Sequence, residues 1–304
     1  MSRHIHLWFR DAYDPSEPRD PSGKWTEGGG GRSTKTSHLT AAPANRAQWP
    51  RHIKKLAIPP AWTAVRISSD PRAPLQATGT DAKGRTQYMY SDRHKKSQSA
   101  AKFRRIKALE KRFDLVTRRL ERDMKGRDRV NREHAQVAHL ILDMGLRPGS
   151  EADRGDVQTY GATTLKGSHV KDNGKRLEFI GKMGVPLDLP VDNPVLAQTL
   201  AERARQAGAD GQLFPNVSDA SLRAYVRKIA GADFKTKDFR TLKGTKLANQ
   251  LVEAAPVPTS KSAYKKAVRD VAEKVAKKLG NTAAIALQSY ISPLIFAPWQ
   301  GALA

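Results

Sequence analysis

Hydrophobic and polar positions follow two different patterns along this chain of 304 residues. Hydrophobic and β-forming residues alternate in part with polar ones in three short segments, 61–67, 75–79 and 86–90. From residue 99, hydrophobic side chains recur every three or four positions, which is typical of amphipathic helices. The pattern predicts a small β-rich region followed by a larger, mainly helical one.

A second group of strands interrupts the helical region between residues 160 and 188. Its expected strands are 163–165, 168–170, 176–180 and 185–187, with turns at Asp172-Asn173-Gly174 and 181–184. The expected helices are a basic one ending at Gly126, then 128–144, 194–207, 218–229, 242–254, 260–279 and a last one that contains Tyr290. Ser218 and Ser260 are of the residue type preferred at helix N-caps.

These patterns predict an α+β protein in three parts. Residues 1–44 are rich in Gly, Pro, Ser and charge, and we expect a flexible tail there. Residues 45–98 form the expected β-rich N-terminal domain. Residues 99–304 form the expected larger helical domain, which contains the short β-sheet or hairpin.

The net charge of +24 indicates a polyanionic partner, either a nucleic acid or an anionic membrane surface. The chain has no cysteine, which excludes a disulfide scaffold, a thiolate nucleophile and cysteine-bound zinc. It contains no P-loop and no His-Glu-x-x-His motif, so we expect neither a nucleotide cofactor nor a metal site. Apolar runs are too short to span a bilayer. Of the two kinds of polyanion we expect a nucleic acid, and no membrane partner. The basic helix over 102–125 suits intrahelical ion pairs or phosphate contact, and we favour phosphate contact for part of it.

Five scattered polar residues stand at structurally marked positions. Arg147 follows a helix end, Lys182 stands at a hairpin tip, and Arg240 comes just before an expected helix. Asn281 follows the helix-ending Gly280, and the last helix carries Tyr290. Each of them alone carries little information.

Together with two N-terminal runs, these residues resemble the type IB DNA topoisomerases, in particular the compact poxvirus and bacterial branch. The resemblance spans about residues 45–296 and rests on the runs Leu56–Trp62, Leu75–Tyr88, Leu146–Gly149, Gly181-Lys182, Thr236–Thr241, Leu279–Thr282 and Ser289-Tyr290. It implies the catalytic fold that these enzymes share with tyrosine recombinases, and a cytoplasmic or nucleoid-associated protein of a bacterium or virus.

The resemblance also implies a role for each of the five residues. Tyr290 would attack a DNA phosphodiester and become joined to the 3′-phosphate. Arg147 and Arg240 would hold the non-bridging oxygens, and Lys182 would protonate the departing 5′ oxygen. Asn281 stands where many members have His, so it can donate a hydrogen bond but not transfer a proton. Resealing then needs neither ATP nor metal, because the phosphotyrosine conserves the energy of the broken bond.

The chemistry of these residue types agrees with those roles. Arginine stays charged, and its fork of donors matches phosphate oxygens. A tyrosine with an ordinary pKa near 10 is a poor nucleophile at neutral pH and needs nearby cations. A lysine holds a proton ready for a basic alkoxide.

The expected partner is duplex DNA, enclosed by a two-lobed clamp and relaxed by nicking, swivelling and resealing, for supercoils of either sign. The resemblance implies that strand 86–90 enters the major groove, and the candidate DNA-binding residues are Arg85, Gln87, Tyr88, Tyr90 and Lys237. We expect a monomer.

Two alternatives remain open. A tyrosine recombinase shares the catalytic set, but it usually has His three positions before the second arginine, where this chain has Lys237, and its N-terminal domain is helical. A non-enzymatic duplex DNA-binding protein on the same scaffold would be unaffected by Tyr290→Phe. An RNA-binding module is disfavoured because the chain lacks an RNP-like aromatic motif.

Overall fold

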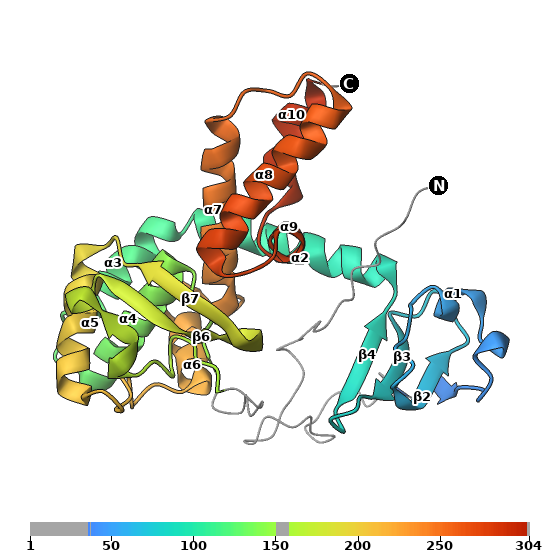
Figure 1. Cartoon of the computed structure of the whole chain (residues 1–304), viewed down its shortest axis with the longest axis horizontal. Coiled ribbons are helices and arrows are strands. Elements are labelled where there is room, and N and C mark those ends of the chain that lie inside the picture. The colour runs from blue at the N-terminus through green and yellow to red at the C-terminus, as the bar shows by residue number, and fades with distance from the viewer. Residues whose placement is uncertain (1–35, 37, 150–157, 303–304) are drawn as a thin grey trace. The chain divides into compact units, whose positions relative to one another are not determined.

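The computed structural model describes residues 36, 38–149 and 158–302, and the chain divides into two compact units, residues 1–102 and 103–304. The division falls inside helix α2 (Asp92–Glu110), which is continuous across it (Figure 1). The sequence predicted this boundary at residue 98.

The N-terminal unit is an antiparallel sheet in the order β1-β2-β3-β4. Its elements are β1 (Leu39–Ala41), η1 (Arg46–Gln48), α1 (Arg51–Lys54), β2 (Thr63–Ser68), β3 (Leu75–Thr80) and β4 (Thr86–Tyr90). Trp49, Ile53 and Ile67 are buried in its core. The three strands expected from the alternating pattern are therefore confirmed.

Strand β1 corrects one prediction. The expected flexible tail, residues 1–44, lies mostly outside the described residues, but Leu39–Ala41 pair with Arg66–Ser68 of β2. The side chain of Leu39 is buried. A strand of three residues is too short to show a period, so the sequence pattern could not reveal it.

The second unit is mainly helical around a three-stranded antiparallel sheet in the order β5-β6-β7 (Figure 1). Its helices are α3 (Phe113–Met124), α4 (Arg129–Met144), α5 (Pro194–Ala207), α6 (Asp219–Ala230), α7 (Thr236–Glu253), α8 (Lys261–Leu279), α9 (Ala283–Ser289) and α10 (Ala297–Gly301). The strands are β5 (Val170–Lys171), β6 (Arg176–Gly181) and β7 (Val185–Pro190), and the short turns are η2 (Gly167–His169), η3 (Asp172–Gly174), η4 (Lys182–Gly184) and η5 (Pro293–Phe296). The α+β fold expected from the sequence is confirmed.

Two apolar clusters hold this unit together. The larger is formed by α2 to α7 and the sheet, with Phe214 and Phe239 fully buried. The smaller joins the second half of α7 to α8, α9 and the segment after them, with Trp299 at its centre. Tyr290 packs against this smaller cluster.

Several sequence expectations for this unit are wrong. The basic helix is two helices, because α2 ends at Glu110 and α3 begins at Phe113. Near the break, Arg112 donates a hydrogen bond to the carbonyl of Ala230 at 2.9 Å, and Arg119 donates one to the carbonyl of Ile229 at 2.6 Å. These two arginines therefore provide hydrogen-bond donors for the last carbonyls of α6.

Residues 163–165 form a turn and not a strand. Of the expected strand 168–170, only Val170 lies in a strand, because the chain forms the turn η2 up to His169. Helix α7 begins at Thr236 rather than 242, because the side chain of Asp238 accepts the N–H of Lys235 and so caps an additional turn.

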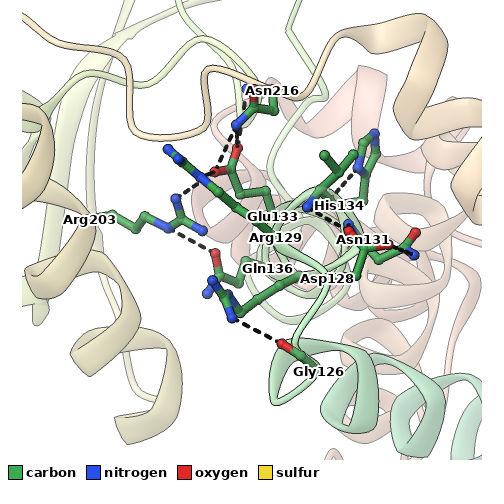
Figure 2. A network of polar contacts seen from close by, with 11 residues as sticks. Gly126, Asp128, Arg129, Asn131, Glu133, His134, Gln136, Arg203 and Asn216 are labelled. Atoms are coloured by element: carbon green, nitrogen blue, oxygen red, sulfur yellow. Dashed lines mark hydrogen bonds and ion pairs between the residues drawn. The ribbon is translucent and has the colours of Figure 1, made fainter.

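Helix α4 is anchored by a buried polar network, which Figure 2 shows from close by. The carboxylate of Glu133 is fully buried and accepts hydrogen bonds from Arg203 at 2.8 Å and from the side chain of Asn216 at 3.1 Å. Arg203 also donates to Gln136 at 3.0 Å. Burial raises the pKa of Glu133, but the hydrogen bonds from Arg203 and Asn216 outweigh it and hold the pKa below its ordinary value. The network fixes the helix that leads to Arg147.

Candidate active site

The first side chain of the site follows the end of α4. Gly145 ends this helix with φ at 71°, in the left-handed region that glycine adopts without strain. Arg147 stands two residues later and is half-buried. Its Nη2 donates to Oδ1 of Asn281 at 2.7 Å, although the two residues are 134 positions apart in the sequence.

Arg240 lies on α7, not before a helix as the sequence predicted, and its side chain is buried. Its guanidinium donates to the carbonyl of Gly145 and, at 2.6 Å, to the carbonyl of Leu279. These carbonyls stand at the C-terminal ends of α4 and α8, where the helix dipole favours a cation. Burial lowers the pKa of Arg240 to about 10, and the adjacent Tyr290 opposes that shift, so the guanidinium is still charged at neutral pH.

Tyr290 is the C-cap residue of α9 and does not lie within the last helix, where the sequence predicted it. Its backbone N–H donates to the carbonyl of Ala286. The guanidinium carbon of Arg240 lies 4.8 Å from the centre of the tyrosine ring. Thr245 fixes the backbone at this point by donating to the Tyr290 carbonyl at 2.8 Å. The phenol therefore has a defined position beside a buried cation.

The electrostatics of Tyr290 favour the phenolate. Burial raises the pKa of the phenol, but the charges of Arg240 and Arg147 and hydrogen bonds from both guanidinium groups outweigh it, so the pKa lies below its ordinary value of 10. This is the direction that activates a tyrosine nucleophile.

Lys182 stands at the turn between β6 and β7, as the sequence predicted. It lines the same pocket as Arg147 and Arg240, and the walls of this pocket include Tyr160 and Phe179. Asn281 follows Gly280, which ends α8 in the left-handed region, and its Nδ2 donates to the carbonyl of Leu279 at 3.3 Å. Three of the five candidate catalytic residues, Arg147, Lys182 and Arg240, thus line this pocket. The other two contact its arginines, Asn281 through Arg147 and Tyr290 through Arg240.

The candidate DNA-binding residues of the first unit gather on and beside β4. Arg85 and Gln87 both donate to the carboxylate of Asp81, at 2.8 and 3.0 Å. Burial raises the pKa of Asp81, but hydrogen bonds and the charge of Arg85 outweigh it and bring the pKa to about 2. Tyr88 pairs across the sheet with Thr78, and the ring of Tyr90 stacks on the ring of His94. The remaining candidate, Lys237, lies on α7, one turn before Arg240.

Several groups that build the site were missed by the sequence analysis. The carbonyls of Gly145 and Leu279 are backbone groups and leave no residue-type signal. Asp81 was interpreted only as a turn residue, although a carboxylate and an arginine at the two ends of the same turn can form an ion pair. Thr245 resembles many other polar helix residues, and only its contact with Tyr290 marks it.

Within residues 36, 38–149 and 158–302, no group of three or more His, Cys, Asp or Glu side chains is arranged to hold a metal ion. Across the same part of the chain, no helix is long and apolar enough to cross a membrane.

Comparison with known proteins gives the same family from both ends of the chain. Residues 91–290 match the family model of the eukaryotic DNA topoisomerase I catalytic core, and residues 41–81 match that of the bacterial DNA topoisomerase IB N-terminal domain. The DNA topoisomerase 1B of Acanthamoeba polyphaga mimivirus is 30% identical over 256 residues, which cover 79% of this chain and 76% of the viral protein.

Cellular relatives match over shorter stretches. The DNA topoisomerase 1 of Mycosarcoma maydis is 27% identical over 39% of this chain and 12% of its own length. The DNA topoisomerase 1 beta of Arabidopsis thaliana is 22% identical over 56% of this chain and 19% of its own length. The chain belongs to the type IB DNA topoisomerase family of enzymes, as its sequence motifs indicated.

Proposed function

We propose that this enzyme relaxes both positive and negative supercoils in duplex DNA by nicking one strand, with Tyr290 as the nucleophile. The phenolate oxygen attacks the phosphorus, the bond to the 5′ oxygen breaks, and the 3′-phosphate is joined to the tyrosine. The cut strand swivels, and the 5′ hydroxyl then attacks the phosphotyrosine to reseal the DNA. The cycle consumes no ATP and needs no metal ion, and a monomer performs it.

One observation carries this proposal: Tyr290 stands beside two arginines that lower the pKa of its phenol. The guanidinium of Arg240 lies 4.8 Å from the ring centre. A lower pKa raises the phenolate fraction at neutral pH, and a purely structural tyrosine needs no such environment.

The arginines that activate the tyrosine also suit the phosphate. Arg147 and Arg240 line one pocket, which gives two cations to the two non-bridging oxygens. Each preorganised donor of this kind contributes about 2.7–4 kcal/mol in comparable sites. Asn281 would donate its amide N–H to the same phosphate after releasing the carbonyl of Leu279.

Lys182 is the proposed general acid. It lines the pocket of the two arginines from the β6–β7 turn. Giving its proton to the departing 5′ oxygen avoids a free alkoxide, and the lysine takes the proton back on religation.

The proposed clamp uses the first unit for recognition. Gln87, Tyr88 and Tyr90 of β4 would read the major groove, with Arg85 beside them, and Lys237 would contact a phosphate near the cleavage site. The charge of +24 favours such contacts.

The test is relaxation of negatively and positively supercoiled plasmid in EDTA without ATP, comparing the wild type with Tyr290→Phe. Relaxation of both plasmids by the wild type only, with a covalent protein–DNA complex on the 3′ side, supports the proposal. Equal activity in Tyr290→Phe would exclude Tyr290 as the nucleophile. DNA binding without relaxation by either protein would favour a non-enzymatic binder, or a recombinase that needs its own target site.

A further inference from the structure

Arg105 and Asp238 form a buried ion pair that does not line the pocket of Arg147, Lys182 and Arg240. Asp238 lies on α7, the helix that carries Arg240. The carboxylate of Asp238 on α7 is 1% exposed. It accepts two hydrogen bonds from Arg105 on α2, from Nε at 2.7 Å and from Nη2 at 3.0 Å. It also accepts the backbone N–H of Lys235 at 2.9 Å. The roles proposed above use neither Arg105 nor Asp238.

The pair stands where the position of α7 is set. Asp238 lies in the first turn of this helix, two residues before Arg240, and Phe239 between them is fully buried. Arg105 is equally constrained, because Phe103 and Ile106 of α2 are buried in the same apolar cluster as Phe239. The ion pair therefore links two packed helices and is not a loose surface contact.

We propose that Arg105 and Asp238 are positioning residues for DNA cleavage, because their ion pair fixes the first turn of α7 and thereby the place of Arg240. The proposal rests on the function assigned to Tyr290 and Arg240 above. A bidentate ion pair fixes both the distance and the relative orientation of the guanidinium and the carboxylate. A lysine at position 105 could not reproduce it, because its ammonium is a single point charge.

Both partners of this ion pair belong to the second unit. Helix α2 begins at Asp92 and runs to Glu110, and Arg105 lies in its second half, three residues past the division between the units. The pair therefore joins α2 to α7 within one compact unit.

The experiment measures single-turnover formation of the covalent complex on a linear duplex, with enzyme in excess, for Arg105→Ala and Asp238→Asn. A displacement of about 1 Å in a catalytic group costs up to about 100-fold in rate, so we expect cleavage to be roughly 10- to 100-fold slower. Arg104→Ala is the matched control, since it removes the same charge from an exposed position on the same helix.

Two further readouts separate positioning from a general loss of structure or charge. Duplex affinity at fixed salt should stay close to that of the wild type, because the Arg105 guanidinium binds Asp238 and not phosphate. The rise of the cleavage rate with pH should move to higher pH, since the charge of Arg240 lowers the pKa of Tyr290 and a displaced Arg240 lowers it less.

A cleavage rate for Arg105→Ala equal to that of Arg104→Ala would overturn the proposal, and so would slower cleavage with an unshifted pH profile. If Arg105→Ala does not fold, Arg105→Lys takes its place. A reduced cleavage rate with an upward shift of the pH profile would then support the proposal, and a wild-type cleavage rate would overturn it. Failure of the proposed function is recognised separately, because Tyr290→Phe would then form the covalent complex with DNA to the same extent as the wild type.

Discussion

The contact between Arg147 and Asn281 makes a prediction about the position where many relatives have histidine. The Oδ1 of Asn281 accepts from Arg147 Nη2 at 2.7 Å, so the asparagine orients a cation that we propose holds the scissile phosphate. Asn281→Ala removes this acceptor and leaves the guanidinium of Arg147 less well oriented. A hydrogen bond to a charged group contributes about 1.5–3 kcal/mol, which corresponds to roughly 10- to 150-fold in rate.

The assay is single-turnover cleavage of a duplex at saturating enzyme, with relaxation of plasmid as a second readout. Asn249→Ala is the control, because Asn249 is on α7 and bonds only Glu253 among the described contacts. A rate for Asn281→Ala within threefold of the wild type would refute the reasoning, since Arg147 would then need no partner.

Asn281→His tests the same contact through pH. A neutral imidazole nitrogen can accept from Arg147, whereas a protonated ring cannot. With an ordinary pKa near 6.5, the histidine variant should keep most of its activity at pH 8 and lose activity relative to the wild type below about pH 6.5. A ratio of rates that stays constant from pH 8 to pH 5.5 would contradict this account.

Three further outcomes follow from the structure. Gly244→Ala should slow cleavage by roughly 10- to 100-fold, because the added Cβ would stand 3.0 Å from the Cβ of Tyr290, whereas Gly301→Ala meets no atom within 4 Å and should be silent in the same assay. Arg203→Met should destabilise the fold by about 3–5 kcal/mol in urea unfolding at pH 7, because it leaves the charge of Glu133 buried without its main partner. Glu133 has a lowered pKa in the fold, so its stabilisation is present above its ordinary pKa of 4.5 and is lost as the pH falls, and the deficit of Arg203→Met should shrink at pH 4. Duplex binding should weaken by about 10³–10⁵ between 50 and 200 mM salt if the clamp makes six to ten phosphate contacts, and an unchanged affinity would argue against the clamp.

Local signals in the sequence predicted much of the fold. Ser218 and Ser260 cap α6 and α8 as expected, because a serine side chain satisfies the free N–H groups of a helix start wherever the helix is packed. Gly145 and Gly280 end α4 and α8 because the left-handed conformation is open to glycine. The turn at residues 172–174 joins β5 to β6 because Asp, Asn and Gly are the residue types that tolerate the positive φ found at all three positions.

Where prediction failed, a tertiary contact decided the outcome. The basic helix breaks before Phe113, next to Arg112 and its partner in α6, and the start of α7 is set by Asp238, which also binds Arg105. Strand β1 exists only because β2 offers it a partner.

The sequence by itself identified the candidate residues of the site, namely a tyrosine, two arginines, a lysine and an asparagine, from short motifs around each of them. Only the tertiary structure decided that Arg147 meets Asn281 and that Arg240 stacks on Tyr290 between the ends of two helices. Helix and turn signals act over a few residues, whereas these contacts join positions 39 to 134 apart. The lowered pKa of Tyr290 belongs to that second level, because the cations that cause it are brought to the phenol by packing alone.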